Sequence, residues 1–188
     1  MKKIGTLLFI ALLALNLTAQ DNMFAKGDKV VNLGIGIGSV LYTGTGYTSS
    51  IPPISASFEV GVKDDVLDVG SIGVGGYLGY ASSKWEYSYG GYSYGYKYTN
   101  IILGARGTFH YPLVDNLDTY TGIMLGFNIV SAKEFGDIDP LNSYSTSASG
   151  AIFSWYAGGR YYFTDSFAAM AEIGYGIAWL NLGVALKL

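Results

Sequence analysis

The chain has 188 residues, with eleven basic and fourteen acidic side chains, a formal net charge of −3 and no cysteine. These values exclude disulfide bonds and thiolate metal sites, and they give no electrostatic case for nucleic-acid binding. Glycine (27) and tyrosine (17) are abundant and only 13% of residues are charged. This much glycine disfavours helices, and the length is enough for one domain.

The first nineteen residues are expected to be a cleaved secretory signal peptide. Lys2 and Lys3 precede an apolar run over residues 4–17, and the small residue Ala19 follows it. The run is shorter than the ~20 residues of a membrane-spanning helix, and no later segment approaches that length. The mature chain, 20–188, then carries nine basic residues against fourteen acidic ones.

Eight segments of the mature chain alternate large apolar residues with glycine, small or polar residues at a period of two. In chain order they cover residues 31–37, 54–62, 72–80, 101–111, 121–129, 153–163, 167–175 and 180–188. The apolar face of each segment is bulky, whereas the opposite face is mostly too small to be an outer surface. Large residues facing lipid around a narrow interior predict a transmembrane β-barrel.

The connections between these segments follow a second alternation. Short links at 63–68, 112–118 and 164–166 alternate with longer ones at 39–53, 81–100 and 133–149, and only 176–179 breaks the trend. Outer-membrane barrels have short periplasmic turns and longer extracellular loops. An even number of strands, with both termini on the periplasmic side, fits this arrangement.

The longest connection is expected to be a tall tyrosine-rich hairpin with Gly90-Gly91 at its turn. Its aromatic positions are symmetric about the two glycines, as in a hairpin with a two-residue primed turn. The same symmetry continued downward pairs Tyr80 with Ile101 without a bulge. The aromatic residues then share one face, which continues the interior face of the barrel: Trp85, Tyr87, Tyr89, Tyr92, Tyr94, Tyr96 and Tyr98. They either stiffen the hairpin by stacking or form a recognition surface, and both roles are compatible.

Several charged residues alternate onto the interior face of the predicted barrel. They are Glu59, Arg106, Arg160, Glu172 and Lys187, with His110 near the periplasmic end. Isolated interior charges are costly, so we expect a paired network that plugs the lumen, with Arg160 bound to Glu172. A gated proton or ion path is the functional alternative, although eight strands leave little room for a permanent pore.

The strand pattern, the N-terminal segment and the closing run 180–188 together resemble the small eight-stranded outer-membrane barrel proteins of the OmpX, OmpW and OmpA transmembrane-domain type. The resemblance implies an eight-stranded antiparallel up-and-down barrel in the outer membrane. It also implies that the insertion machinery reads the last strand, which usually ends in an aromatic residue in that family and ends in Leu188 here.

The sequence predicts a monomeric, non-enzymatic surface protein without cofactor or metal. The hairpin and the 133–149 connection are expected to contact an extracellular partner or the lipopolysaccharide layer. A gated channel or transporter for a small apolar solute is the alternative, and it requires an open lumen below Tyr77. An enzyme would require a serine hydroxyl near His110, the single histidine. A soluble lipocalin-like barrel would require the apolar faces to point inward.

Overall fold

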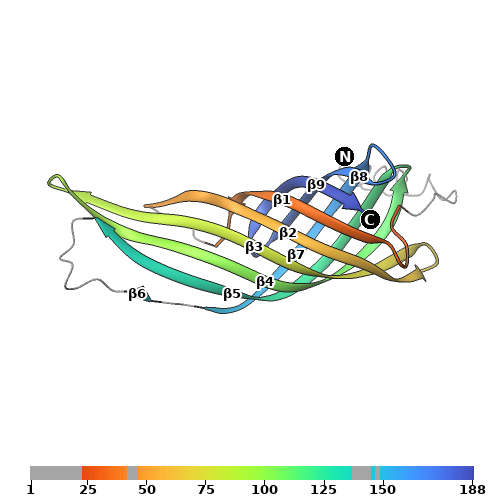
Figure 1. The fold of residues 1–188 in the computed structure, drawn as a ribbon, viewed down its shortest axis with the longest axis horizontal. Helices are drawn as coiled ribbons and strands as arrows, with labels where there is room; N and C mark the ends of the chain where they lie inside the picture. Colours follow the sequence, from red (N-terminus) through yellow and green to blue (C-terminus); the bar gives the residue numbers. More distant parts are fainter. Residues whose placement is uncertain (1–22, 42–45, 137–144, 147–148) are drawn as a thin grey trace, which may run out of the picture.

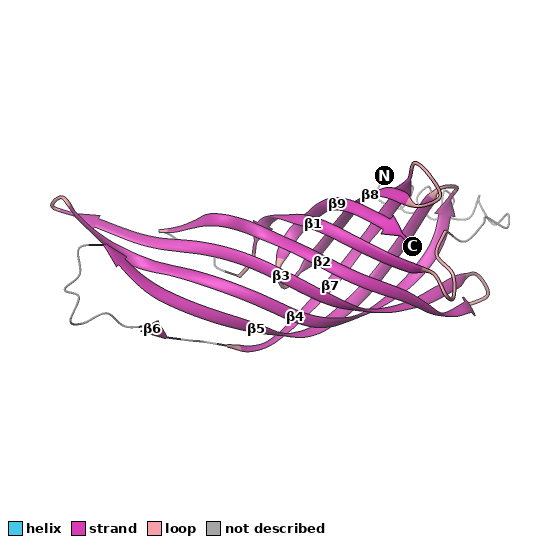
Figure 2. Ribbon diagram, viewed as in Figure 1, coloured by secondary structure: helices cyan, strands magenta, loops and turns pink. Residues whose placement is uncertain are grey.

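The protein forms a closed β-barrel in the computed structural model, which describes residues 23–41, 46–136, 145–146 and 149–188. The expected signal peptide, 1–19, and parts of the 39–53 and 133–149 connections lie outside the described residues. In Figure 2 the described residues form strands and loops. No helix in the described part of the chain is long and apolar enough to cross a membrane.

Eight long strands make up the barrel wall, and a ninth, very short strand lies beside it (Figure 1). In chain order the strands are β1 (Lys29–Ser39), β2 (Tyr47–Val66), β3 (Gly70–Tyr89), β4 (Tyr92–Val114), β5 (Leu117–Gly136), β6 (Ser145–Thr146), β7 (Gly150–Tyr162), β8 (Phe167–Tyr175) and β9 (Ala178–Lys187). Each long strand covers one of the eight alternating segments, apart from the last residue of two of them, Phe163 and Leu188, so the predicted strands are confirmed. The two-residue β6 was not predicted.

The sheet closes on itself through antiparallel neighbours. The strand order runs β4-β3-β2-β1-β9-β8-β7-β5, and β5 pairs again with β4 to complete the ring. The up-and-down topology satisfies backbone groups around the whole circumference, which is why a closed sheet can sit in lipid. The predicted eight-stranded antiparallel barrel is therefore confirmed.

The pairing of β3 with β4 runs from Ser71 opposite His110 to Tyr89 opposite Tyr92 without a register shift, as the symmetry of the hairpin predicts. At the turn, Gly90 and Gly91 both have positive φ, 61° and 87°, which is the backbone of a primed hairpin turn. These two strands and β5 reach far beyond the rest of the barrel, whereas β8 and β9 meet in a short turn (Figure 1). The rim is tall on one side and low on the other.

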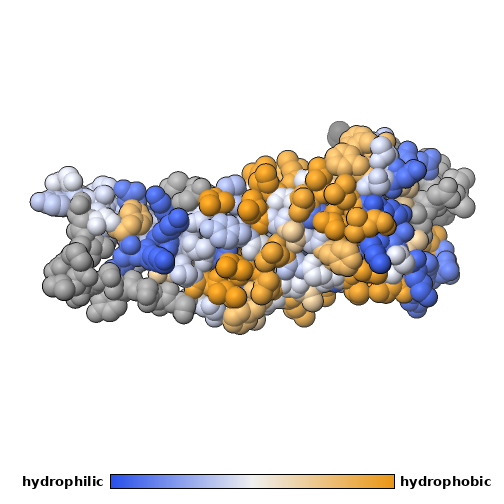
Figure 3. All heavy atoms as spheres, viewed as in Figure 1, coloured by the Kyte–Doolittle hydropathy of each residue, from blue (hydrophilic) through white to orange (hydrophobic). Residues whose placement is uncertain are grey.

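Large apolar side chains lie on the outside of the barrel. One example from each long strand, exposed between 42% and 63%, is Leu33, Phe58, Leu78, Leu103, Leu125, Trp155, Ile173 and Leu182. Figure 3 shows that such residues gather over the middle of the molecule, with hydrophilic residues toward both ends. The apolar faces therefore point outward, opposite to the arrangement that a soluble lipocalin-like barrel requires.

Candidate functional site

We take the hairpin end of the barrel as its top. The lower part of the lumen, away from the hairpin, holds a charge cluster centred on Arg160, whose side chain is fully buried. Its Nη1 donates to Asp118 Oδ2 at 3.0 Å, and its Nη2 donates to Glu59 Oε2. His110 contacts the other oxygens of both carboxylates, through Nδ1 to Asp118 at 2.7 Å and through Nε2 to Glu59 at 3.1 Å. Four different strands contribute to this cluster, so each carboxylate is shared between a guanidinium and an imidazole.

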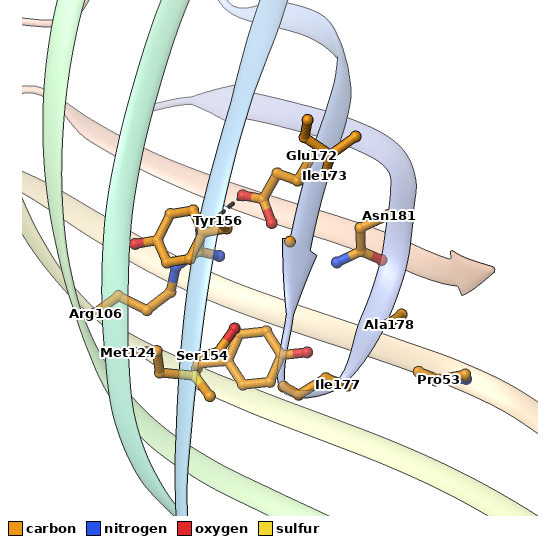
Figure 4. Close-up of a pocket in the computed structure, with 12 residues that line it drawn as sticks. Pro53, Arg106, Met124, Ser154, Tyr156, Glu172, Ile173, Ile177, Ala178 and Asn181 are labelled. Carbon is orange, nitrogen blue, oxygen red and sulfur yellow. Dashed lines mark hydrogen bonds and ion pairs between the residues drawn. The ribbon is translucent and has the colours of Figure 1, made fainter. Parts of the chain in front are cut away.

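A second cluster lies one layer above the first. Arg106 Nη2 donates to Glu172 Oε1 at 2.6 Å, and the two side chains point toward each other across the lumen (Figure 4). The hydroxyl of Tyr120 donates to the same carboxylate oxygen at 2.9 Å. The Arg106 guanidinium also lies 3.8 Å from the ring centroid of Tyr156, so a carboxylate and an aromatic face both stabilise this cation.

Tyr120 connects the two clusters. Its hydroxyl bonds to Glu172 in the upper cluster, while its ring lies 4.6 Å from the guanidinium carbon of Arg160 in the lower one. Its side chain is almost completely buried. Tyr120 therefore links the two layers of charge into one buried network through the middle of the barrel, in which the Nε of Arg160 has no hydrogen-bond partner among the described residues.

The segment before β1 closes the end of this network that lies opposite the hairpin. The Phe24 ring is stacked on His110 with 4.0 Å between the centroids, and it is 1% exposed. The carbonyl of Phe24 accepts a hydrogen bond from Ser71 Oγ at 2.7 Å, and Gly27 N donates to Gly61 O at 2.9 Å. Phe24 and its neighbours thus form a cap across the end of the barrel.

Above the upper cluster there is a small cavity of about 30 Å³. Its wall includes Tyr77, Arg106, Met124, Tyr156 and Ile177, most of which are labelled in Figure 4. Because one water needs roughly 10–15 Å³, the cavity has room for about two waters. Ile177 and Met124 also belong to a buried apolar cluster with Tyr77 and Ile102.

The structure brings four of the five predicted lumen charges together, namely Glu59, Arg106, Arg160 and Glu172. The predicted pair of Arg160 with Glu172 is wrong, because Arg160 binds Glu59 and Asp118 whereas Glu172 binds Arg106. Alternation identifies the face of a residue but does not identify its partner across the lumen.

The fifth predicted lumen charge, Lys187, lies outside the network. Its Nζ forms an ion pair with Asp28 at 2.6 Å and donates to the carbonyl of Met23 at 3.0 Å, at the end of the barrel opposite the hairpin. The sequence analysis missed two members of the site. Asp118 was assigned to a turn, although it continues the interior alternation of β5, and Phe24 precedes every periodic segment.

The geometry around His110 gives no support to a hydrolytic site. Both ring nitrogens contact carboxylates, and Ser71, directly opposite on β3, donates to Phe24 instead. Within the described ranges no serine hydroxyl is bonded to the imidazole, and no cluster of histidine, aspartate and glutamate has the arrangement of a metal site.

The aromatic face of the hairpin continues the interior face beyond the barrel rim. We call its described side chains the tyrosine wall: Trp85, Tyr87, Tyr92, Tyr94, Tyr96 and Tyr98. The side chain of Tyr89 lies outside the described part. Neighbouring rings contact each other, as Trp85 does with Tyr94 at 6.3 Å and Tyr96 at 6.4 Å. Tyr92 at the tip is 71% exposed. The rings at the base of the wall therefore contact each other, whereas the ring at the tip is exposed.

Below its tip the wall also carries a polar contact. Tyr96 lies opposite Glu134 of β5, and the hydrogen bond and negative charge of this carboxylate raise the pKa of the Tyr96 phenol. Tyr47 of β2 joins the same row through its ring contact with Tyr98 at 6.0 Å. The wall is thus braced by β2 on one side and by β5 on the other.

No protein-family model and no curated protein matches the chain. Among solved structures, the chain is similar to the N-terminal β-barrel domain of Pseudomonas aeruginosa OprF, with 16% identity, a TM-score of 0.49, and 87% and 98% of the two chains covered. Ail of Yersinia pestis gives 16% identity and a TM-score of 0.49 over 86% and 95%. Neisserial surface protein A has 13% sequence identity to this chain and a TM-score of 0.41, with 86% of this chain and 94% of that chain covered. These likenesses concern the barrel fold alone.

Proposed function

We propose that the protein is an integral outer-membrane β-barrel with a closed lumen, which acts at its extracellular surface and not as an enzyme. The observation that carries the proposal is the belt of exposed apolar side chains contributed by all eight long strands. Water-soluble monomers rarely expose apolar patches larger than several hundred Å². In lipid the same belt is the favourable outer surface of a transmembrane barrel.

The orientation follows from the connections. The turns after β2, β4 and β7 are short, and on the opposite side β3 and β4 extend far beyond the belt. Outer-membrane barrels place their short turns in the periplasm. The tyrosine wall is therefore assigned to the cell exterior, and the Phe24 cap to the periplasmic end.

The contents of the lumen support a closed barrel over a conducting one. Two layers of paired charge, the Phe24 cap and the apolar cluster around Ile102 succeed one another along the axis. A small apolar solute entering past the tyrosine wall would meet the Arg106–Glu172 pair directly below Tyr77. The alternative of a transporter for such a solute thus has no continuous apolar path in its favour.

The tyrosine wall is the part of the exterior best suited to contact another molecule. Tyrosine offers large amphipathic contact area with little side-chain entropy to lose, and its ring stacks on sugars and flat apolar groups. The ring contacts within the wall hold this surface in shape, because cross-strand aromatic pairs contribute about 0.2–1 kcal/mol each. Stiffening and recognition are both served by one set of residues.

The three tryptophans provide a direct test of the membrane assignment. Trp155 lies on the outer belt and is 47% exposed, whereas Trp85 lies in the tyrosine wall beyond the belt. Two matched single-tryptophan variants, each with the other tryptophans replaced by phenylalanine, are refolded into vesicles that contain lipids brominated at known chain depths. We expect strong quenching of Trp155 by mid-chain bromines and little quenching of Trp85. Weak and equal quenching of both would refute the proposal.

A further inference from the structure

The parts of β3, β4 and β5 that extend beyond the rest of the barrel form a sheet that we call the tall wall. Three lysines form a row across its outer surface. Lys84 on β3 lies directly opposite Lys97 on β4, and Lys97 lies directly opposite Lys133 on β5. Neighbouring strands are about 4.8 Å apart, so the three side chains start within roughly 10 Å of one another. We call this set the lysine row. All three side chains are exposed.

The row faces the membrane side of the wall and not the lumen. Lys97 is four residues beyond the outward-facing Ile101 on the unbroken strand β4, so the two side chains point to the same face. Tyr96 and Tyr98, on either side of Lys97, belong to the tyrosine wall on the opposite face. The tall sheet therefore has an aromatic inner face and a basic outer face.

The row also lies at a definite level above the apolar belt. Four residues at ~3.3 Å each, tilted ~40° from the barrel axis, place the Lys97 backbone about 10 Å beyond Ile101. The headgroup zone extends about 5–8 Å beyond the hydrocarbon on each side of a bilayer. Because a lysine side chain can bend toward the interface, its ammonium group reaches the level of the lipid phosphates.

Among the described residues, none of the recorded ion pairs involves a lysine of the row. Glu86 lies two residues beyond Lys84 on the same face. The Nζ of Lys84 lies 5.2 Å from the ring centroid of Phe135, so this ring lies beside the row. Like charges directly opposite each other destabilise a sheet unless something binds between them.

The distribution of basic residues makes the row distinct. The six other lysines and arginines after residue 20 lie either in the lumen, as Arg106 and Arg160 do, or at the periplasmic end, as Lys26, Lys29, Lys63 and Lys187 do. The chain as a whole is acidic. All the remaining basic residues therefore lie at one height on one face of the sheet.

We propose that the lysine row binds the phosphate groups of a phosphorylated lipid in the outer leaflet. The inference rests on the proposed function, because it needs the belt to lie in a bilayer. Lysine is a common phosphate ligand, and a row of three ammonium groups matches a headgroup that carries more than one phosphate. The lipid headgroup holds the tall wall on its outer face while the tyrosine wall stays free on the inner one.

The test compares two triple variants of the full mature protein in a neutral detergent. One is Lys84→Gln with Lys97→Gln and Lys133→Gln. The matched control makes the same charge change at the periplasmic end, with glutamine in place of Lys26, Lys29 and Lys63. The probes are lipid A with both phosphates, lipid A after enzymatic removal of its phosphates, and inorganic phosphate. Native mass spectrometry gives the affinity of each.

We expect the unaltered protein and the control to bind phosphorylated lipid A equally and to prefer it over the dephosphorylated form. Loss of the lysine row should weaken this binding on the order of 100-fold, about fivefold per lysine. Arginine at all three positions should retain it. If the glutamine triple does not fold, as judged by a heat-modifiable gel band, Lys97→Gln alone should still lose about fivefold.

Equal binding by the glutamine triple and the unaltered protein would overturn the inference, as would an equal loss in the control. Complete displacement of the lipid by millimolar inorganic phosphate would overturn the assignment to a lipid and indicate a site for free anions. The tryptophan-quenching experiment in neutral lipid separates the two proposals. Quenching of Trp155 combined with any of these results rejects the lysine row as a lipid site and leaves the membrane assignment intact.

Discussion

The Arg160 cluster predicts a large loss of stability when its cation is removed. Arg160→Met replaces the guanidinium by a flexible apolar side chain that fills much of the same volume. Both partner carboxylates, Glu59 and Asp118, remain buried, with side chains 6% and 2% exposed, and they lose their guanidinium partner while His110 still contacts both. Breaking a buried ion pair on one side costs about 3–5 kcal/mol of unfolding free energy. We expect a loss in that range.

The assay is equilibrium urea unfolding of the barrel in lipid vesicles, followed by tryptophan fluorescence. Lys63→Met, at an exposed position of β2, serves as the control and should change the unfolding free energy very little. A combined variant, with Arg160→Met, Glu59→Gln and Asp118→Asn, removes all three charges and should recover most of the loss, because no unpaired charge stays buried. A loss below about 1 kcal/mol for Arg160→Met, or a combined variant no more stable than the single one, would refute the reasoning.

Three further predictions follow. A Cβ on Gly75 would collide with the backbone of β2, whereas one on Gly76 meets open space. Gly75→Ala should therefore lower the unfolding free energy by about 1–3 kcal/mol in the same urea assay, and Gly76→Ala should not. Equal losses for the two variants would contradict the packing. Phe24→Ala removes the ring stacked on His110 and should cost about 3–5 kcal/mol, and a near-zero change would show that the cap is not packed as described. Trp85→Ala removes two ring contacts and should speed proteolysis of the hairpin without changing the urea midpoint of the barrel; unchanged proteolysis would show that stacking does not stiffen the wall.

The barrel wall could be predicted from the sequence because its causes are local. Alternation at a period of two identifies which face of each strand meets lipid, and the Gly90-Gly91 turn sets the register of β3 and β4 for nineteen paired positions. The same symmetry places Lys84 opposite Lys97. Lys133 joins the lysine row only through the register between β4 and β5, which depends on the turn at Asp115 and Asn116.

The contents of the lumen could be predicted only in part. Alternation places Glu59, Arg106, Arg160 and Glu172 inside, but partners across a barrel depend on how the ring closes and how far each strand is tilted. This is why Arg160 and Glu172, close in the sequence pattern, bind different residues. The role of Phe24 has no periodic signal at all, because it precedes the first strand and contacts residues of distant strands, His110 of β4 and Ser71 of β3.

The most direct test of the central claim is the conductance of the refolded mature protein in a planar bilayer. A matched sample has the hairpin from Lys84 to Lys97 replaced by a short Asn-Gly turn, and gel-shift assays establish that both samples are folded and inserted. Because the charge network, the Phe24 cap and the apolar cluster occupy the lumen, we expect no single-channel conductance from either sample. Stable single-channel steps from either sample would contradict a closed lumen, and steps from the shortened variant alone would show that the tyrosine wall is the gate.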